Sequence, residues 1–271
     1  MEKQFDVIVA GGGPAGIAAS VSAARCGANT ALIERYGILG GMMTSGAVHP
    51  ILGNTAPNTM YQEVCALLNE GHENVPKDTT RNGSEIHVDP EEAKYRLLKL
   101  VCDSGVKLYL QTPIADVCKD GNRVTGVTVV TQDGLVTLNA KCVVDSTGDG
   151  FVAYRAGAEY HVGRESDGRC QPLSTEFTLE NVDEARAITC WGGSDPVTMP
   201  DGKKFSVFCR EAHDRGELPE NVTIVRLHRT FYPGERNVNA TQVNGLDSLH
   251  AEGITDAELK LRGQIPQIVA F

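Results

Sequence analysis

A glycine-rich segment near the start of the chain has the residue types and spacing of a nucleotide-binding turn. The segment Gly11-Gly12-Gly13-Pro14-Ala15-Gly16 follows the apolar run 5–10 and precedes a run of small residues over 14–26 that predicts a helix. Gly11 permits the tight turn, Gly13 lets a diphosphate approach the backbone, and Gly16 lets helix and strand pack closely. The free N–H groups at the helix N-terminus then bind the phosphates.

An acidic residue completes this pattern. Glu34 directly follows the second predicted strand, 30–33, and lies 23 positions after Gly11. Its carboxylate can accept hydrogen bonds from an adenosine ribose and disfavours a 2′-phosphate, so NADP is a poor ligand while FAD and NAD both stay open. We predict that Gly13→Ala or Gly16→Val abolishes nucleotide binding and leaves the chain folded.

The elements that position this turn indicate an α/β fold. A helix is expected from its N-cap Asp89 to about Ser104, and Asp133-Gly134 is a hairpin signal. We therefore predict a Rossmann-like parallel sheet with helices on its faces, a three-stranded crossover sheet over 108–140, and a second α+β substrate or cap module. The further expected strands are 106–110, 114–117, 124–130, 135–140 and 142–145, and the domains are 1–154 and 155–271.

The second module holds the candidates for substrate chemistry. Its predicted elements are strands around 173–179 and 223–227 and a helix over 205–215. An Arg side chain can hold a carboxylate through two parallel hydrogen bonds, and His titrates near neutral pH. The catalytic candidates are Arg226, His228 and Arg229, with Arg164 and Arg169 considered beside them. Such residues are more often solvated or structurally paired.

Composition and charge exclude several classes of protein. The 271 residues carry 25 Lys and Arg against 35 Asp and Glu, a net charge of −10, which disfavours nucleic acid and anionic membranes as partners. The eight cysteines include no CxxC pair, and we expect them to be buried small residues in a reducing compartment. No His spacing suggests a metal site, and the start resembles no signal peptide, so we expect a cytoplasmic protein without a metal.

Several segments together resemble the FAD-dependent oxidoreductases, whose nucleotide domain is glutathione-reductase-like. They are the DxxIxGGGPAG start over Asp6–Gly16, the GGMMTSG stretch over Gly40–Gly46, the segment Asp145-Ser146-Thr147-Gly148-Asp149-Gly150 and the stretch from Asn239 onward. The resemblance covers essentially the whole chain and implies FAD as the cofactor.

The resemblance also implies which residues contact FAD. Gly11, Gly13, Pro14, Ala15 and Gly16 would hold the pyrophosphate and Glu34 the ribose, with Arg35 beside it. Gly40, Gly41 and Met42 would line the path to the ribityl chain, with Thr44 and Ser45 near the flavin ring. The Val117 backbone, in a strand expected beside the first, would meet the adenine, and Thr147, Gly148 and Asp149 would form a second glycine turn. His49 is a further candidate for contact with the cofactor.

One departure concerns the end of the chain. Family members usually continue to a later Gly-Asp segment that closes over the flavin, and nothing after Gly150 has that context. The capping box Thr255-Asp256-Ala257-Glu258 predicts the start of a helix that ends on the apolar residues 268–271. We expect a truncated product, or one half completed by a partner subunit or a second copy.

Three functions follow from these patterns. The first is a flavoenzyme, or the FAD-binding portion of one, that acts on a small organic substrate by hydride transfer. The second is a non-catalytic nucleotide-binding or assembly subunit completed by a partner chain. The third is a protein similar to thiazole synthase, which uses NAD.

Overall fold

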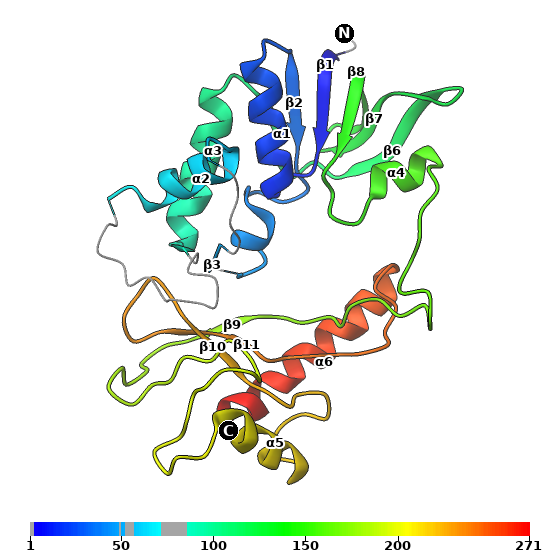
Figure 1. The fold of residues 1–271 in the computed structure, drawn as a ribbon. Helices are drawn as coiled ribbons and strands as arrows, with labels where there is room; N and C mark the ends of the chain where they lie inside the picture. Colours follow the sequence, from blue (N-terminus) through cyan, green and yellow to red (C-terminus); the bar gives the residue numbers. More distant parts are fainter. Residues whose placement is uncertain (1–2, 49, 52–56, 72–85) are drawn as a thin grey trace. The chain divides into compact units, whose positions relative to one another are not determined.

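The chain forms two compact units in a computed structural model that describes residues 3–48, 50–51, 57–71 and 86–271. The described residues up to Tyr160 form unit 1, and those from His161 onward form unit 2 (Figure 1). The predicted boundary after Tyr154 stays a prediction, and it falls inside α4 (Phe151–Ala156).

Unit 1 is built on a six-stranded sheet with the order β5-β2-β1-β8-β7-β6. Its strands are β1 (Lys3–Ala10), β2 (Thr30–Ile33), β5 (Lys107–Tyr109), β6 (Ile114–Asp120), β7 (Arg123–Thr131) and β8 (Gly134–Asp145). The first four positions in this order are parallel, whereas β8, β7 and β6 form an antiparallel meander. The predicted α/β fold class with its crossover strands is confirmed.

The long strand β8 joins the two parts of this sheet. Sequence reasoning expected two strands here, 135–140 and 142–145, separated at Lys141. The structure shows one strand that pairs with both β1 and β7. Lys141 does not interrupt the strand because its side chain is exposed and its ammonium pairs with Asp6 at 2.7 Å.

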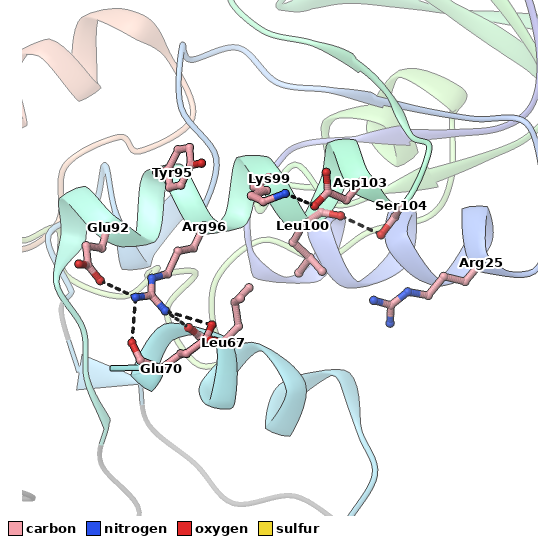
Figure 2. Close-up of a pocket in the computed structure, with 10 residues that line it drawn as sticks. All are labelled: Arg25, Leu67, Glu70, Glu92, Tyr95, Arg96, Lys99, Leu100, Asp103 and Ser104. Carbon is pink, nitrogen blue, oxygen red and sulfur yellow. Dashed lines mark hydrogen bonds and ion pairs between the residues drawn. The ribbon is translucent and has the colours of Figure 1, made fainter. Parts of the chain in front are cut away.

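Helices cover one face of the unit 1 sheet. They are α1 (Pro14–Arg25), α2 (Met60–Asn69) and α3 (Pro90–Asp103), and short segments are η1 (Gly41–Met43), β3 (Pro50–Ile51) and β4 (Ile86–His87). The predicted cap of α3 is confirmed, because an Asp89 carboxylate oxygen accepts the N–H groups of Glu91 and Glu92 at 2.8 and 3.1 Å. Arg96 of α3 donates to backbone carbonyls at the end of α2, which ties the two helices together (Figure 2).

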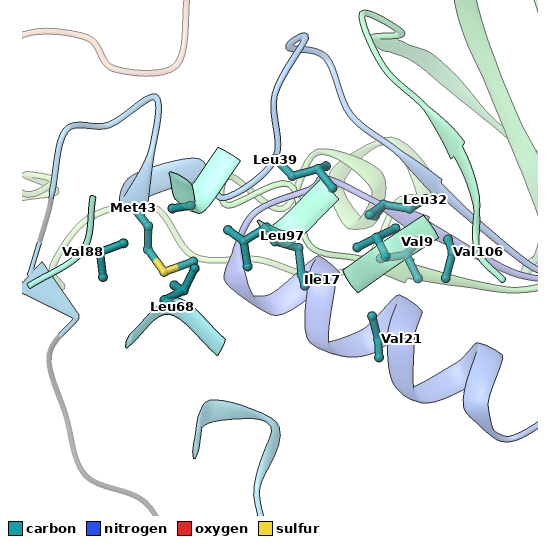
Figure 3. Close-up of a cluster of buried hydrophobic side chains, with 12 residues drawn as sticks. Val9, Ile17, Val21, Leu32, Leu39, Met43, Leu68, Val88, Leu97 and Val106 are labelled. Carbon is teal, nitrogen blue, oxygen red and sulfur yellow. The ribbon is translucent and has the colours of Figure 1, made fainter. Parts of the chain in front are cut away.

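Apolar side chains on both faces of β1 form the core of unit 1. Val9 packs with Ile17 and Leu97 on the helix side (Figure 3). Its neighbour Ile8 belongs to a second cluster that joins β1 and β2 to Val127 of β7 and to residues of β8. Adjacent strand residues point to opposite faces, so the consecutive buried residues Ile8, Val9 and Ala10 cover both sides of β1 as a parallel strand requires.

Unit 2 contains a separate three-stranded antiparallel sheet in the order β10-β11-β9. Its elements are β9 (Phe177–Leu179), α5 (Phe205–Asp214), β10 (Arg226–Arg229), β11 (Arg236–Asn239) and α6 (Ala251–Ala270). The predicted strand around 173–179 contains β9, the one around 223–227 overlaps the start of β10, and the helix over 205–215 matches α5, whereas β11 was not predicted. The bounds of such short strands are poorly defined by the alternation of apolar and polar residues. An apolar cluster that includes Val238, Phe205 and Ile268 forms the core of this unit.

The last helix begins one turn before the predicted capping box. The N-cap of α6 is His250, and the Thr255 hydroxyl donates to the Ala251 carbonyl within the helix at 2.7 Å. The predicted start at Thr255 is wrong, because a Ser or Thr hydroxyl can also bond to the preceding turn. The apolar end does find neighbours: Ile268 is buried, and the Phe271 ring lies 5.3 Å from that of Phe208. Neither α6 nor any other described helix is long and apolar enough to span a membrane.

The cysteines are only partly buried. Cys65, Cys190 and Cys209 are buried, and Cys118 is half-buried. The expectation of burial is wrong for four others, which are exposed: Cys26, Cys102, Cys142 and Cys170. Whether a cysteine is buried depends on which face of its helix or strand it occupies, and the amino-acid composition does not contain this information.

Candidate functional site

Three loops meet at the carboxyl ends of β2, β1 and β8. The Gly11 N–H donates to the Ile33 carbonyl at 2.8 Å, and the Gly40 N–H donates to the Gly12 carbonyl at 2.9 Å. The Ser146 N–H donates to the Ala10 carbonyl at 2.8 Å. These bonds bring together the predicted glycine turn, the GGMMTSG stretch and the Asp145–Gly150 segment. Ligands of open α/β sheets bind at this edge.

Two glycines of the first turn are required by close backbone packing. Gly11 has φ of +99°, and a Cβ there would lie 2.3 Å from the Ser146 carbonyl oxygen. A Cβ on Gly16 would lie 1.7 Å from the Gly11 carbonyl oxygen. The expectation that Gly16→Val leaves the chain folded is therefore wrong, because the obstacle is the protein's own backbone.

Gly13 differs from these two because the space beside it is open. No heavy atom lies within 4 Å of the place where its Cβ would be. Gly13 is the N-cap of α1, no side chain caps this helix, and the following Pro14 and Ala15 are exposed. The N-terminal N–H groups of α1 thus have no capping side chain, and they form a cradle suited to the phosphates of a dinucleotide.

The second loop closes one side of this cradle. A Cβ on Gly41 would come within 3.0 Å of the Gly13 Cα, so the loop lies directly against the turn. The Thr44 hydroxyl donates to the Leu39 carbonyl at 2.7 Å, and the Ser45 hydroxyl donates to the Gly41 carbonyl at 3.0 Å. Both hydroxyls therefore hold the loop in shape. Met42 is 60% exposed.

Glu34 is buried and holds the end of β2 against the glycine turn. One carboxylate oxygen accepts the Gly12 N–H at 2.6 Å, and the other accepts the Tyr36 N–H at 2.8 Å. The sequence predicted that Glu34 binds a ribose, but it did not predict that Glu34 accepts hydrogen bonds from two backbone N–H groups. A carboxylate has about four lone-pair sites, so two acceptor positions are left for a ribose. The neighbouring Arg35 is exposed, and its guanidinium lies 4.9 Å from the centre of the Tyr36 ring.

Asp145 organises the third loop. Its carboxylate accepts the Thr147 hydroxyl at 2.7 Å and the Ala153 N–H at 2.8 Å, while the Thr147 hydroxyl oxygen accepts the Phe151 N–H at 3.0 Å. Burial raises the pKa of Asp145, but these hydrogen bonds and others outweigh burial and bring the pKa below its ordinary value of 3.8. Asp145 and Thr147 thus fix the start of α4. Gly148 and Asp149 are exposed beside them.

Val117 lies away from these loops in the sheet order. It belongs to the edge strand β6, which β7 and β8 separate from β1. The expectation that its strand lies beside the first is wrong, because the chain passes from β6 through two hairpins to β8, and β8 is the strand that pairs with β1. Its predicted contact with adenine stays a prediction. His49 lies outside the described residues.

The groove along α1, α2 and α3 is not a second candidate site. It has a volume of about 780 Å³, and Figure 2 shows the residues that line it. Its charged groups pair among themselves or with neighbours: Arg25 with Glu63, Arg96 with Glu92, and Lys99 with Asp103. The first pair joins α1 to α2, the other two lie along α3, and together they leave no cation or anion in excess.

The candidates in unit 2 separate into two faces of one strand. Arg226 and His228 alternate with Leu227 and Arg229 along β10, and Leu227 packs against the apolar cluster. Arg229 therefore lies on the other face, where its charge helps to lower the pKa of Glu184. Arg164 and Arg169 form exposed ion pairs with Asp167.

Sequence reasoning missed Glu176, just before β9. Its carboxylate accepts the Asn239 side-chain amide at 2.8 Å. Burial raises the pKa of Glu176 to about 7, against opposing effects of a hydrogen bond from Asn237 and the positive charge of Arg226. In the sequence, the one pattern that points to Glu176 is the alternation of polar and apolar residues in the neighbouring strands of the sheet.

Comparison with known proteins places these features in a family. The sequence model of the FAD dependent oxidoreductase family matches residues 6–271. The chain is 32% identical over 185 residues to the tRNA uridine 5-carboxymethylaminomethyl modification enzyme MnmG of Aquifex aeolicus, covering 63% of this chain and 29% of that protein. It is 30% identical over 183 residues to the thiamine thiazole synthase of Methanothermobacter thermautotrophicus, covering 62% and 66%.

A solved structure supports the fold over the full length. The geranylgeranyl bacteriochlorophyll reductase-like protein of Thermoplasma acidophilum aligns with a TM-score of 0.59 and 16% identity, covering 100% of this chain and 62% of that one. The chain thus spans less than two thirds of the length of each of these proteins.

Proposed function

The chain belongs to the FAD-dependent oxidoreductase family, and we propose that it is an oxidoreductase, or the FAD-binding portion of one, that acts on a small organic substrate by hydride transfer. The main support for this proposal is the N-terminus of α1 at Gly13, which no side chain caps and beside which two further glycine-containing loops lie. The sequence prediction of the family and of FAD as its cofactor is confirmed.

The residues around this cradle fit the parts of FAD. We assign the diphosphate to the backbone N–H groups after Gly13 and the adenosine ribose to the remaining acceptor positions of Glu34. The Gly40–Gly41 loop and the Thr147–Asp149 turn would enclose the remainder, with Thr44 and Ser45 toward the flavin. When bound, FAD supplies a hydride acceptor and donor, and the chain binds it, orients it and excludes water.

The substrate side of the proposal concerns unit 2. Arg226 and His228 share one face of β10, where a guanidinium can hold an anionic group and an imidazole can move a proton. A partner subunit or a second copy of the chain is a further part of this proposal. A cytoplasmic location fits a flavoenzyme with a small, water-soluble substrate.

A second candidate is a thiazole synthase-like protein that uses NAD. Its support is the 30% identity to a thiamine thiazole synthase, matched over 66% of that protein's length. The acidic Glu34 suits NAD as well as FAD, because both carry an unmodified ribose.

One experiment separates these two functions. The purified chain is incubated with FAD or with NAD, freed of excess nucleotide by gel filtration, and heated, and the released compound is identified by mass. We expect FAD to be retained, and a Gly13→Val variant to lose it because the added side chain fills the cradle. Retention of NAD or a fragment of it, with FAD refused, would instead support the second candidate.

A further inference from the structure

The sheet of unit 2 has one apolar and one polar face. The apolar face carries Leu227, Val238 and Phe177, which pack in the core of the unit. Strand alternation and register place a different set on the other face: Glu176, Thr178, Arg226, His228, Asn237 and Asn239. Arg226 lies opposite Asn239, and His228 lies opposite Asn237.

This polar face is buried to an extent unusual for polar residues. Asn237 is fully buried, and His228 is 7% exposed with its ring 4.2 Å from that of Trp191. One carboxylate oxygen of Glu176 has essentially no accessible surface. The polar face of an antiparallel sheet normally lies in water, and burial of polar groups costs free energy unless they form hydrogen bonds. A bound ligand can supply hydrogen bonds to such groups.

The charges on this face favour an anion. Among the described residues, Arg226 makes no ion pair, whereas Arg236 on the other face forms a bidentate pair with Glu184 at 2.8 and 3.0 Å. The raised pKa of Glu176, about 7, leaves its carboxyl partly protonated at neutral pH. The positive charge of Arg226 is therefore only partly balanced.

We propose that this polar face is a binding site for a small carboxylate, with Arg226 as the anchoring cation and Glu176, held by Asn237 and Asn239, as a hydrogen-bond donor to the ligand in its protonated form. The guanidinium offers two parallel hydrogen bonds to a carboxylate, and a protonated carboxyl offers one O–H. Binding of the anion favours the protonated Glu176, so it is accompanied by proton uptake. This inference deepens the proposed function and rests on it for the reaction.

The single tryptophan of the chain makes the site measurable. The Trp191 ring contacts the His228 ring at an interplanar angle of 56°, so its emission reports on this face. Sodium glycolate is added to the purified chain at constant ionic strength, with sodium chloride and uncharged glycolamide as controls. We expect a saturable change with glycolate alone, weakened at least about tenfold in Arg226→Met, as expected for loss of a hydrogen-bonded charged group. Arg210→Met, an exposed arginine on α5, should bind like the wild type.

The proton linkage gives a second test. Arg226 and His228 share the sheet face of Glu176, and the charge of Arg226 acts on the Glu176 carboxylate. On this face β11 contributes the amides of Asn237 and Asn239, and the Cys190 thiol lies within electrostatic range of both Arg226 and Asp195. If ionised Glu176 opposes the anion, glycolate affinity falls by about tenfold between pH 6 and pH 8 and becomes nearly constant in Glu176→Gln. A dependence that persists in Glu176→Gln and disappears in His228→Gln would contradict the assignment.

The outcomes separate this site from the proposed function. An unchanged Trp191 emission, or equal glycolate binding in wild type and Arg226→Met, with FAD retained, would overturn the carboxylate site alone. Failure to retain FAD with glycolate binding intact would overturn the proposed function alone.

Discussion

Gly16→Ala and Gly13→Ala should differ in effect: the first should lower the stability of the fold and the second the affinity for FAD. A Cβ on Gly16 would lie 1.7 Å from the Gly11 oxygen, whereas ordinary contact begins at 3.4 Å, so α1 or the turn must move by about 1.7 Å. Overpacking of this kind costs about 1–3 kcal/mol or more, and a loss of ~3 kcal/mol lowers the melting temperature by ~6–12 °C in a chain of this size. We expect Gly16→Ala to be at this upper end.

Gly13→Ala should instead spare the fold and weaken the cofactor. The added methyl meets no protein atom, and φ of −73° at this N-cap suits alanine, so the cost stays within about 1 kcal/mol. The methyl occupies the approach of the diphosphate, and loss of one hydrogen bond to a charged group, ~1.5–3 kcal/mol, weakens FAD binding about tenfold or more. Thermal unfolding without cofactor and FAD titration measure the two effects. Equal melting temperatures for both variants, or wild-type FAD affinity in Gly13→Ala, would refute this reasoning.

Two further predictions concern stability. Asp89→Ala removes the cap of α3 and should cost about 1 kcal/mol in urea unfolding, while Asp89→Asn keeps most of it; an equal loss in both variants would show that the cap is not the cause. Arg236 and a backbone N–H lower the pKa of Glu184 from 4.5 to about 2, so the stability this carboxylate contributes is present above pH 4.5 and lost as the pH falls toward 2. The difference in melting temperature between wild type and Glu184→Gln should accordingly shrink from pH 6 to pH 3, and a constant difference would contradict the ion pair's contribution.

The sequence predicted the nucleotide-binding unit because its signals are local. Gly16 is required by its contact with the Gly11 carbonyl oxygen within one βαβ unit, and Asp89 caps the helix that begins at the next residue. These patterns depend on neighbouring residues and on periodicity, which a single sequence contains. The continuous strand β8 was not predicted, because the exposed Lys141 interrupts an apolar pattern without interrupting the hydrogen bonds.

The polar face of unit 2 could not be predicted because it depends on pairing across the sheet. Glu176 and Asn239 are separated by 63 residues, and only the register of β9 and β11 brings them together. Side-chain alternation along β10 places Arg229 on the opposite face from Arg226, although sequence proximity had grouped them. Glu34 was found for its type and position, but its bonds to two backbone N–H groups needed the fold of the loop.

The most direct test of the cofactor site is a crystal structure of the chain grown with FAD. We expect the diphosphate to lie within hydrogen-bond distance of the backbone N–H groups that follow Gly13, and an adenosine ribose hydroxyl to donate to Glu34. FAD bound elsewhere, with the N-terminus of α1 facing only water, would contradict it.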